Sequence, residues 1–276
     1  MNPAKRVLTE YAAMCHVLEG RDLLALAAAT VTHGRTILRT HKLTTLDRAM
    51  SRTMIVRFSK TRIVLPLADI DRILSAINDN PTFGNVREIY ARNIYLKHFN
   101  FKRPPSAILD AGANRGMFSI VALLAFNAQI AVGVEPVPLY ESVHQLLMEA
   151  NNCNMSRAPR YLKYLSNPSD ENRDPAQNIS IKTILKEHNI VRFNLAKIDI
   201  EGGEQALFDE PEWLANVDNI AIEFHPDKVN NSLLVPEVLE RYGLKYKFRD
   251  NDGRPADLKS ATFLYASCTG ELKMRE

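Results

Sequence analysis

The chain has 276 residues, 46% of them hydrophobic, which is enough to bury a substantial core in one large domain with an attachment or in two smaller domains. With 24% charged residues and a formal net charge of +3, the composition excludes a disordered polyelectrolyte and does not indicate a nucleic-acid partner. Residues 1–66 hold 11 Lys and Arg against 4 Asp and Glu, so the basic surplus is N-terminal. This surplus is interpreted either as a solvated helical face or as a patch that faces an acidic partner, an anionic substrate or a membrane surface.

The cysteines and the apolar runs indicate the cellular compartment of the protein. The three cysteines, Cys15, Cys153 and Cys268, are odd in number and far apart, so they give neither a disulfide framework nor a CxxC metal knuckle. The longest apolar run, residues 23–31, is far shorter than the roughly 20 residues that cross a bilayer. The first residues contain no signal-peptide core. We therefore expect a cytoplasmic protein without an integral membrane segment.

The N-terminal third is expected to be helical with one β-hairpin. Apolar periodicity predicts, in chain order, two helices within residues 5–40 divided at Gly20, a hairpin of strands 54–58 and 62–65 joined by 59–61, and helices over 70–77 and 86–100. Residues 1–80 are interpreted as an extension that caps a site or makes an oligomer contact, including a homodimer, because its apolar faces are too few for an independent core.

From residue 107 onward, strands alternate with helices. The expected strands are 107–109, 130–134, 195–200 and 219–224, followed by a final pair at 245–248 and 262–266. The expected helices are 116–126, 138–151, 181–188 (capped by Ser180), 204–208 and 235–242, and residues 152–178 are expected to be mostly loop with one strand near 161–165. Residues 81–276 are therefore predicted to form a doubly wound, Rossmann-like α/β domain whose sheet is mostly parallel, with an antiparallel terminal hairpin.

The strongest motif is the turn between the first predicted strand of this domain and its helix. It contains Asp110, Gly112, Asn114 and Gly116, with Gly112 and Gly116 four residues apart rather than in the GxGxxG spacing of a pyrophosphate site. Glycine is needed where φ is positive or a ligand approaches closely, and Asn also tolerates left-handed φ. The aspartate suits the ammonium group of an amino-acid ligand, as in a sulfonium cofactor, better than a phosphate. A simple tight turn is the alternative.

A second motif follows the strand 130–134, where Glu135 and Pro136 come 19 residues beyond Gly116. A carboxylate at the carboxyl end of the neighbouring strand can accept both hydroxyl hydrogens of a ribose. Taken alone, a glutamate at a strand end is more often a surface residue. Because it follows the glycine turn at this distance, it predicts a ribose contact.

Two further motifs lie past the strands 195–200 and 219–224. Ligands of open α/β sheets bind at such strand ends, so Asp199 is expected to face a cleft, together with Glu201 or Glu204. Glu204 is alternatively a charge that complements a helix N-terminus. His225 is a candidate general base, because imidazole titrates near neutrality, or else a structural histidine. The other six histidines show no metal spacing with it, so no metal is predicted.

These four motifs, in this order, resemble the FkbM family of S-adenosylmethionine-dependent methyltransferases. The matching stretches are ILDAGANRGMFSI (108–120), VGVEPVPLY (132–140), LAKIDIEGGEQALF (195–208) and IAIEFHP (220–226), and the resemblance extends over about residues 83–265. It implies a class I methyltransferase fold with a seven-stranded sheet. It also implies methylation of hydroxyl groups on sugars, polyketides or other natural products, or in some relatives of peptide amide nitrogens.

The resemblance carries roles over to individual residues. The methionine end of S-adenosylmethionine would be held by Asp110, Gly112, Asn114 and Gly116, and the ribose by Glu135 with Pro136 beside it. Asp199, Glu201 and His225 would line the acceptor side, and His225 or Asp199 would take the proton from a hydroxyl acceptor. The acceptor is then a small molecule, a glycan or a peptide.

Two other functions remain open from the sequence. A nicotinamide-dependent oxidoreductase is disfavoured, because the glycine spacing and Asp110 suit a pyrophosphate poorly. A non-catalytic module would use the fold as a scaffold and the basic N-terminal region as its interaction surface.

Overall fold

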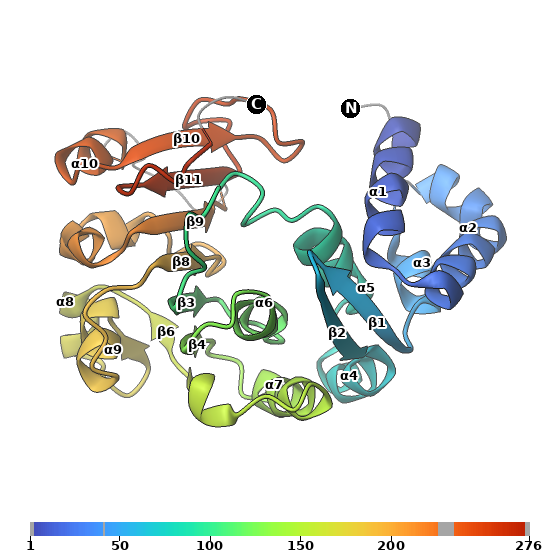
Figure 1. Ribbon diagram of the computed structural model, residues 1–276, viewed down its shortest axis with the longest axis horizontal. Helices are drawn as coiled ribbons and strands as arrows, with labels where there is room; N and C mark the ends of the chain where they lie inside the picture. The colour runs from blue at the N-terminus through green and yellow to red at the C-terminus, as the bar shows by residue number, and fades with distance from the viewer. Residues whose placement is uncertain (1–2, 41, 226–234, 274–276) are drawn as a thin grey trace. The chain divides into compact units, whose positions relative to one another are not determined.

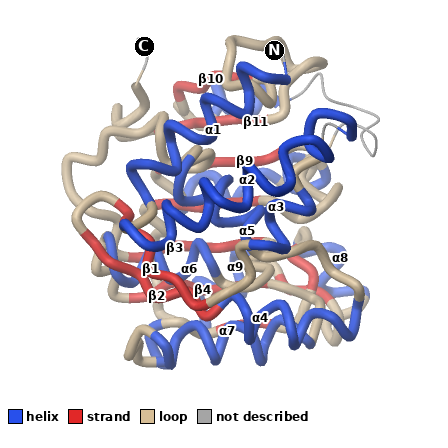
Figure 2. Tube along the Cα trace, turned by 90° about the vertical axis from the view of Figure 1, so that its right-hand side faces the viewer, coloured by secondary structure: helices blue, strands red, loops and turns tan. Residues whose placement is uncertain are grey.

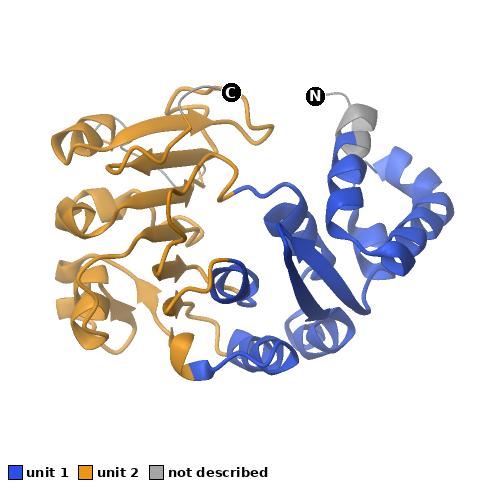
Figure 3. Ribbon diagram, in the orientation of Figure 1, with its two compact units in different colours: residues 1–94, 115–125, 139–155 blue, residues 95–114, 126–138, 156–276 orange. Residues whose placement is uncertain are grey.

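The computed structural model describes residues 3–40, 42–225 and 235–273. Contacts divide the chain into two units (Figure 3), and each is described by itself. The N-terminal unit contains residues 1–94, 115–125 and 139–155; the sheet unit contains residues 95–114, 126–138 and 156–276. The predicted domain boundary at residue 80 stays a prediction.

The N-terminal unit consists of helices around a two-stranded hairpin. Its elements are α1 (Pro3–Val17), α2 (Gly20–Thr40), α3 (Thr44–Ala49), β1 (Thr53–Phe58), β2 (Thr61–Pro66), α4 (Leu67–Leu74), η1 (Ser75–Ile77), α5 (Phe83–Asn85), η2 (Val86–Ala91), α6 (Met117–Ala125) and α7 (Leu139–Ala150). Figure 2 shows α1, α2 and α3 side by side. The two predicted N-terminal helices and the hairpin are confirmed, with Phe58 paired to Thr61 across a turn in which Ser59 has a φ of 56°.

The predicted helix over residues 86–100 is wrong beyond residue 91. The π-helical segment η2 ends at Ala91, and Asn93 has a left-handed φ of 48°, which a right-handed helix cannot include. The aromatic residues that suggested a continuing helix, Tyr95 and Phe99, are buried within the sheet unit instead. Tertiary packing therefore overrides the helical pattern in this segment.

The sheet unit contains the remaining elements (Figure 1). They are β3 (Ala107–Ala111), β4 (Ile130–Val134), η3 (Met155–Arg157), β5 (Arg160–Tyr161), β6 (Tyr164–Leu165), α8 (Pro168–Arg173), β7 (Asn178–Ile179), α9 (Ile181–Glu187), β8 (Leu195–Ile198), η4 (Ala206–Phe208), η5 (Pro211–Asn216), β9 (Asn219–Glu223), α10 (Val235–Arg241), β10 (Lys245–Arg249) and β11 (Phe263–Ser267). As predicted, Ser180 caps α9, accepting a hydrogen bond from the Thr183 N–H at 3.2 Å.

Seven strands form one sheet in the order β10-β11-β9-β8-β3-β4-β5. The pairs among β9, β8, β3, β4 and β5 are parallel, and β11 runs antiparallel to both β9 and β10. The expected α/β class, the mostly parallel sheet and its antiparallel terminal hairpin are confirmed. The chain enters at β3, adds β4 and β5 on one side, and then returns to add β8 and β9 on the other. Sheets of this kind bind ligands beyond the carboxyl ends of the strands at that reversal, here between β3 and β8.

The core of this unit explains why its central strands are continuous apolar runs. Every residue of β8 is buried, and β3, β4 and β9 are buried at four of five positions. Side chains from α9, η5 and α10 pack against them in one cluster, and Figure 1 shows α8, α9 and α10 beside the same face of the sheet. A charged residue within β8, Lys197, is therefore an exception that needs partners.

The segment 152–178 is more ordered than predicted. Two short strands, β5 and β6, stand where one was expected, and the helix α8 was missed. Pro168 occupies the first turn of α8, where its lack of an N–H costs nothing, and Asp170 and Glu171 complement the helix N-terminus. A proline that would interrupt the middle of a helix thus stands here at a helix start. None of the helices in the described residues is both long and apolar enough to span a lipid bilayer.

Candidate active site

The turn after β3 has the backbone conformation that the sequence predicts. Gly112 and Asn114 have positive φ values of 67° and 47°, and the N–H groups of Gly112 and Ala113 both donate to the Val134 carbonyl, at 2.9 and 3.0 Å. A Cβ atom at Gly112 would lie 1.6 Å from the Asp199 carbonyl oxygen. The ends of β3 and β8 therefore approach too closely for any side chain at this position.

Gly116, in the N-terminal unit, is also restricted to glycine. Its φ is 84°, and a Cβ atom there would lie 2.4 Å from His144 Nδ1, within the same unit. Gly116 begins the turn into α6, so packing and backbone conformation both require it.

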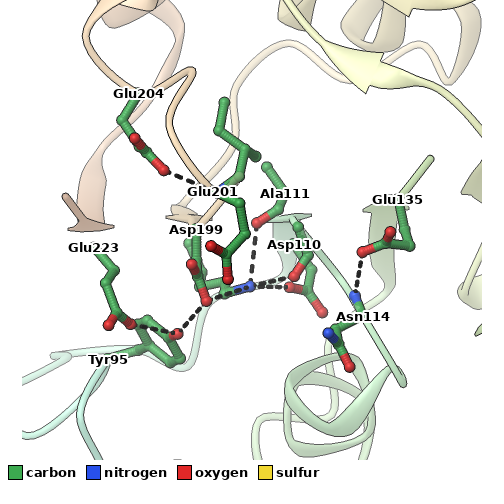
Figure 4. Close-up of polar contacts among 12 residues, drawn as sticks. Tyr95, Asp110, Ala111, Asn114, Glu135, Asp199, Glu201, Glu204 and Glu223 are labelled. Carbon is green, nitrogen blue, oxygen red and sulfur yellow. Dashed lines mark hydrogen bonds and ion pairs between the residues drawn. The ribbon is translucent and has the colours of Figure 1, made fainter. Parts of the chain in front are cut away.

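Glu135 is buried at the end of β4 and is turned towards the turn after β3 (Figure 4). Its Oε2 accepts a hydrogen bond from the Asn114 N–H at 2.9 Å, and its Oε1 accepts one from the Val137 N–H at 3.0 Å. Each carboxylate oxygen has two lone pairs, so each retains acceptor capacity after these bonds. Pro136, which follows, is half-buried.

Asp110 does not stand alone at the end of β3, because Lys197 of β8 neutralises it. The Lys197 ammonium lies 3.3 Å from Asp110 Oδ1 and donates to the carbonyl oxygens of Ala111 and Gly112 at 3.1 and 2.6 Å. Burial by itself would lower the pKa of Lys197, but the negative charges of Asp110 and Asp199 outweigh it and raise that pKa. Lys197 is therefore protonated, and its contacts with Asp110, Ala111 and Gly112 fix the turn after β3.

Asp199 lies just past β8, between the Lys197 ammonium and the Tyr95 phenol. The Tyr95 hydroxyl donates to Asp199 Oδ2 at 2.7 Å and lies 3.1 Å from Glu223 Oε2 at the end of β9 (Figure 4). Lys197 Nζ is 3.8 Å from the same Asp199 oxygen and 5.3 Å from the centre of the Tyr95 ring. Tyr95 therefore contacts both Asp199, just past β8, and Glu223, the last residue of the neighbouring strand β9.

His225 is held by a buried glutamate. Its Nδ1 lies 3.0 Å from Glu204 Oε1, while its Nε2 lies 3.5 Å from Glu201 Oε2 and 3.8 Å from Asp199 Oδ1. Glu204 is fully buried and also accepts the N–H groups of Ile200 and Gly202, at 3.2 and 3.0 Å. Glu201 has a left-handed φ of 58°, a conformation that costs energy outside glycine and often marks functional sites.

These contacts change the proton affinities of the pair. The hydrogen bond to Glu204 raises the pKa of His225 to about 9; burial acts in the opposite direction, and the charges of Glu204, Glu201 and Asp199 add to the rise. Burial would raise the pKa of Glu204, but the hydrogen bonds from His225 and from the Gly202 N–H outweigh it and lower that pKa. An imidazolium facing a carboxylate is therefore the stable state at neutral pH.

Asp199, Glu201 and His225 also offer ligand atoms that all lie within 4.8 Å of one another, a spacing that would fit one metal ion. The spacing of the histidines, on which the prediction of no metal rests, does not indicate this group. A protonated His225 between two carboxylates accounts for the same geometry, so the prediction of no metal stays a prediction.

The structure thus brings Asp110, Gly112 and Asn114 next to Glu135, and Asp199 and Glu201 next to His225, all within the sheet unit. Sequence reasoning gave no role to Lys197 or Tyr95 and left Glu204 undecided. A charge inside the apolar strand β8 was a signal for Lys197. Nothing in the sequence near Tyr95 indicated its contacts, because they join residues more than a hundred positions apart.

Comparison with known proteins defines the class as a methyltransferase. The model for the methyltransferase FkbM domain matches residues 110–248, which is half of the chain and includes Asp110, Glu135, Asp199 and His225. The chain belongs to the FkbM family of methyltransferases. The resemblance stated from the motifs is confirmed.

Individual relatives are distant. Methyltransferase 1 of Beauveria bassiana (strain ARSEF 2860) is 24% identical over 196 residues, covering 56% of this chain and 78% of that protein. Among solved structures, a protein from Streptococcus mutans assigned as an S-adenosylmethionine-dependent methyltransferase has a TM-score of 0.45 at 13% identity. The match includes 78% of this chain and 55% of that protein, so this chain spans about half of the other's length. M. jannaschii TYW2, solved with AdoMet, has a TM-score of 0.40 at 14% identity over 79% of this chain and 85% of that one.

The close approach of β3 and β8 predicts a severe effect for Gly112→Ala. The added methyl group would overlap the Asp199 carbonyl, so we expect the free energy of unfolding, measured by urea denaturation without cofactor, to fall by several kcal/mol. Gly243→Ala is the matched control: its φ of 72° is similar, but its Cβ meets nothing within 4 Å, so only the conformational cost of about 1 kcal/mol applies. Equal losses in the two variants would contradict the steric argument.

Proposed function

We propose that the chain transfers the methyl group of S-adenosylmethionine to a hydroxyl group of a sugar or natural-product acceptor, with His225 as the general base. The observation that carries this proposal is the buried Glu204 carboxylate, which fixes His225 through Nδ1 and leaves Nε2 directed towards Asp199 and Glu201. This is the arrangement of a base oriented by a carboxylate.

The cofactor would be held by the turn from Asp110 to Asn114 and by Glu135 and Pro136. The acceptor capacity left on both Glu135 oxygens suits the two hydroxyl groups of a ribose. Asp110 would act by holding the turn through Lys197, rather than by touching the ammonium group of the methionine end. Gly116 lies in the N-terminal unit, so its contact with the methionine end of the cofactor stays a prediction from the sequence. When bound, S-adenosylmethionine supplies an electrophilic methyl group.

The protein's own residues would position the acceptor and move its proton. His225 Nε2 accepts the hydroxyl hydrogen, and Glu204 stabilises the imidazolium that forms. Asp199 and Glu201 accept hydrogen bonds from other hydroxyl groups of the acceptor, which favours a polyhydroxylated molecule. Tyr95 and Lys197 hold Asp199 in place. Because Asp199 already accepts from Tyr95 and lies next to Lys197, it is a weaker candidate for the base than His225.

Labelled methyl transfer tests the reaction. The protein, incubated with methyl-labelled S-adenosylmethionine and pools of sugars, hydroxylated natural products and peptides, is expected to give O-methylated products, identified by mass and by the methyl chemical shift. His225→Asn should lower turnover by about 10²–10⁴-fold with little change in the affinity for S-adenosylhomocysteine. Label found on peptide amide nitrogens would support the N-methylating alternative, and cofactor binding without transfer would support a non-catalytic module.

The contacts of Glu135 predict its effect on cofactor affinity. In Glu135→Gln, the amide NH₂ must face either the Asn114 or the Val137 N–H, which loosens the turn and removes an acceptor. We expect calorimetry to show binding of S-adenosylhomocysteine weakened by about tenfold or more, since 1.4 kcal/mol corresponds to tenfold. Glu237→Gln, on an exposed position of α10, should bind like the unchanged protein. Unchanged affinity in Glu135→Gln would remove Glu135 from the cofactor site.

The raised pKa of His225 predicts a pH dependence with a defined sign. The imidazole is a base only after it loses its proton, so kcat/KM should rise with pH until about 9. Glu204→Gln removes the main cause of the raised pKa, so the rising limb should move to lower pH; Glu201→Gln should move it less. An NMR titration of the His225 ring in the complex with S-adenosylhomocysteine checks the same shifts without an acceptor. A His225 ring that titrates alike in all three proteins would contradict this account.

A further inference from the structure

Helix α2 exposes a line of large aliphatic side chains. Leu24, Val31 and Leu38 are 73%, 85% and 70% exposed, and they recur every seven residues. Residues seven apart lie on nearly one line along a helix. Single exposed aliphatic residues are ordinary on protein surfaces, whereas a line of three over four turns indicates an interface.

A parallel line on the same helix consists of small residues. Gly20, Ala27 and Gly34 also recur every seven residues, and Ala27 and Gly34 come three residues after Leu24 and Val31. A Cβ atom at Gly20 or at Gly34 would meet nothing within 4 Å. Glycine within a helix costs about 1 kcal/mol relative to alanine, and no contact within the described residues requires Gly34. The two lines together form a heptad pattern in which position a is large and position d is small.

We propose that α2 pairs antiparallel with α2 of a second copy of the chain, forming a two-fold symmetric homodimer. In an antiparallel pair, each a position packs against a d position of the other helix. Leu24 would then lie against the partner's Gly34, Val31 against the partner's Ala27, and Leu38 against the partner's Gly20. Each large side chain meets a small residue, and a Cβ atom at Gly20 or Gly34 would meet nothing within 4 Å. The same pairing holds in both directions, as the isologous interface of a two-fold dimer requires.

Because the exposed charges of α2 are basic, binding to a second copy and binding to an anionic surface should respond to salt in opposite directions. The single acidic residue of α2, Asp22, is buried and bonded to Arg52 at 2.7 Å, whereas Arg21 and Arg35 are exposed. In the antiparallel register, Arg21 flanks the partner's Arg35, so the two helices repel each other weakly. Salt screens this repulsion and should tighten the dimer, although it would weaken binding to an anionic membrane.

Sedimentation equilibrium of the full chain at low and high salt tests the proposal. We expect a monomer–dimer equilibrium that shifts towards the dimer with salt. Gly34→Leu should abolish the dimer by filling the space needed by the partner's Leu24, while helix propensity keeps the monomer at least as stable to urea. Val31→Asp should also abolish it. Val191→Asp, at an 86% exposed position of the sheet unit, is the matched control and should leave the equilibrium unchanged.

A charge reversal on α2 distinguishes a homodimer from membrane binding directly. Arg35→Glu would place a carboxylate beside the partner's Arg21, so the dimer should become tighter. The same change should reduce binding to vesicles that contain phosphatidylglycerol if α2 instead contacts a membrane.

Disulfide trapping tests the orientation. In a background with Cys15→Ser and Cys268→Ser, a mixture of Leu24→Cys and Gly34→Cys chains should form a cross-linked dimer on mild oxidation. Leu38→Cys alone should not, because an antiparallel pair separates the two copies of residue 38 by about 27 Å, from 18 residues at 1.5 Å each.

The proposal is overturned by a monomer at every concentration and salt, by a dimer that is insensitive to Val31→Asp and Gly34→Leu, or by cross-linking of Leu38→Cys with itself. A monomer that binds anionic vesicles and loses this binding in Arg35→Glu would assign α2 to a membrane surface instead.

Discussion

The site depends on one buried ammonium group. Lys197 projects from a strand whose other residues are apolar, and an unpaired charge there would cost several kcal/mol. Its partners are the carboxylates of Asp110 and Asp199 and the carbonyls of Ala111 and Gly112. Each partner stands at the end of β3 or just past β8, where the chain reverses its direction of growth across the sheet. The requirement to satisfy one charge therefore fixes the backbone at the point where such sheets bind ligands.

From this point the polar contacts extend in two directions within the sheet unit. On one side, the turn held by Lys197 presents the Asn114 N–H to Glu135, a carboxylate suited to ribose hydroxyl groups. On the other side, Asp199 is shared with Tyr95 and faces His225, which is oriented by Glu204. The proposed cofactor contacts and the proposed acceptor contacts are thus parts of one network rather than separate sites. A substitution at Lys197 would disturb both.

Sequence reasoning predicted most of the fold, because the central strands are short apolar runs bounded by turn residues and the N-terminal helices are strongly periodic. It failed where tertiary contacts decide the conformation. Residues 92–100 continue a helical pattern, yet Asn93 is left-handed and Tyr95 joins carboxylates far away in the sequence. The helix α8 was missed because Pro168 can mark either a break or a helix start.

The sequence predicts which residues lie at the candidate site, but it does not predict which of them contact one another. Strand-end residues such as Glu135 and Asp199 can be placed at one edge from topology alone. Which carboxylate pairs with Lys197, and which with His225, depends on distances that no spacing in the sequence encodes. Glu204 illustrates this: helix capping and imidazole orientation require the same residue type at the same position.

In the proposed reaction, the acidic surroundings of His225 would also select among acceptors by charge. The carboxylates of Asp199, Glu201 and Glu204 all lie within 3.8 Å of a ring nitrogen of His225. A phosphate or uronate group on the acceptor, close to the reacting hydroxyl, would be repelled by these carboxylates. The same surface would favour neutral glycosides and amino sugars, whose ammonium groups it attracts.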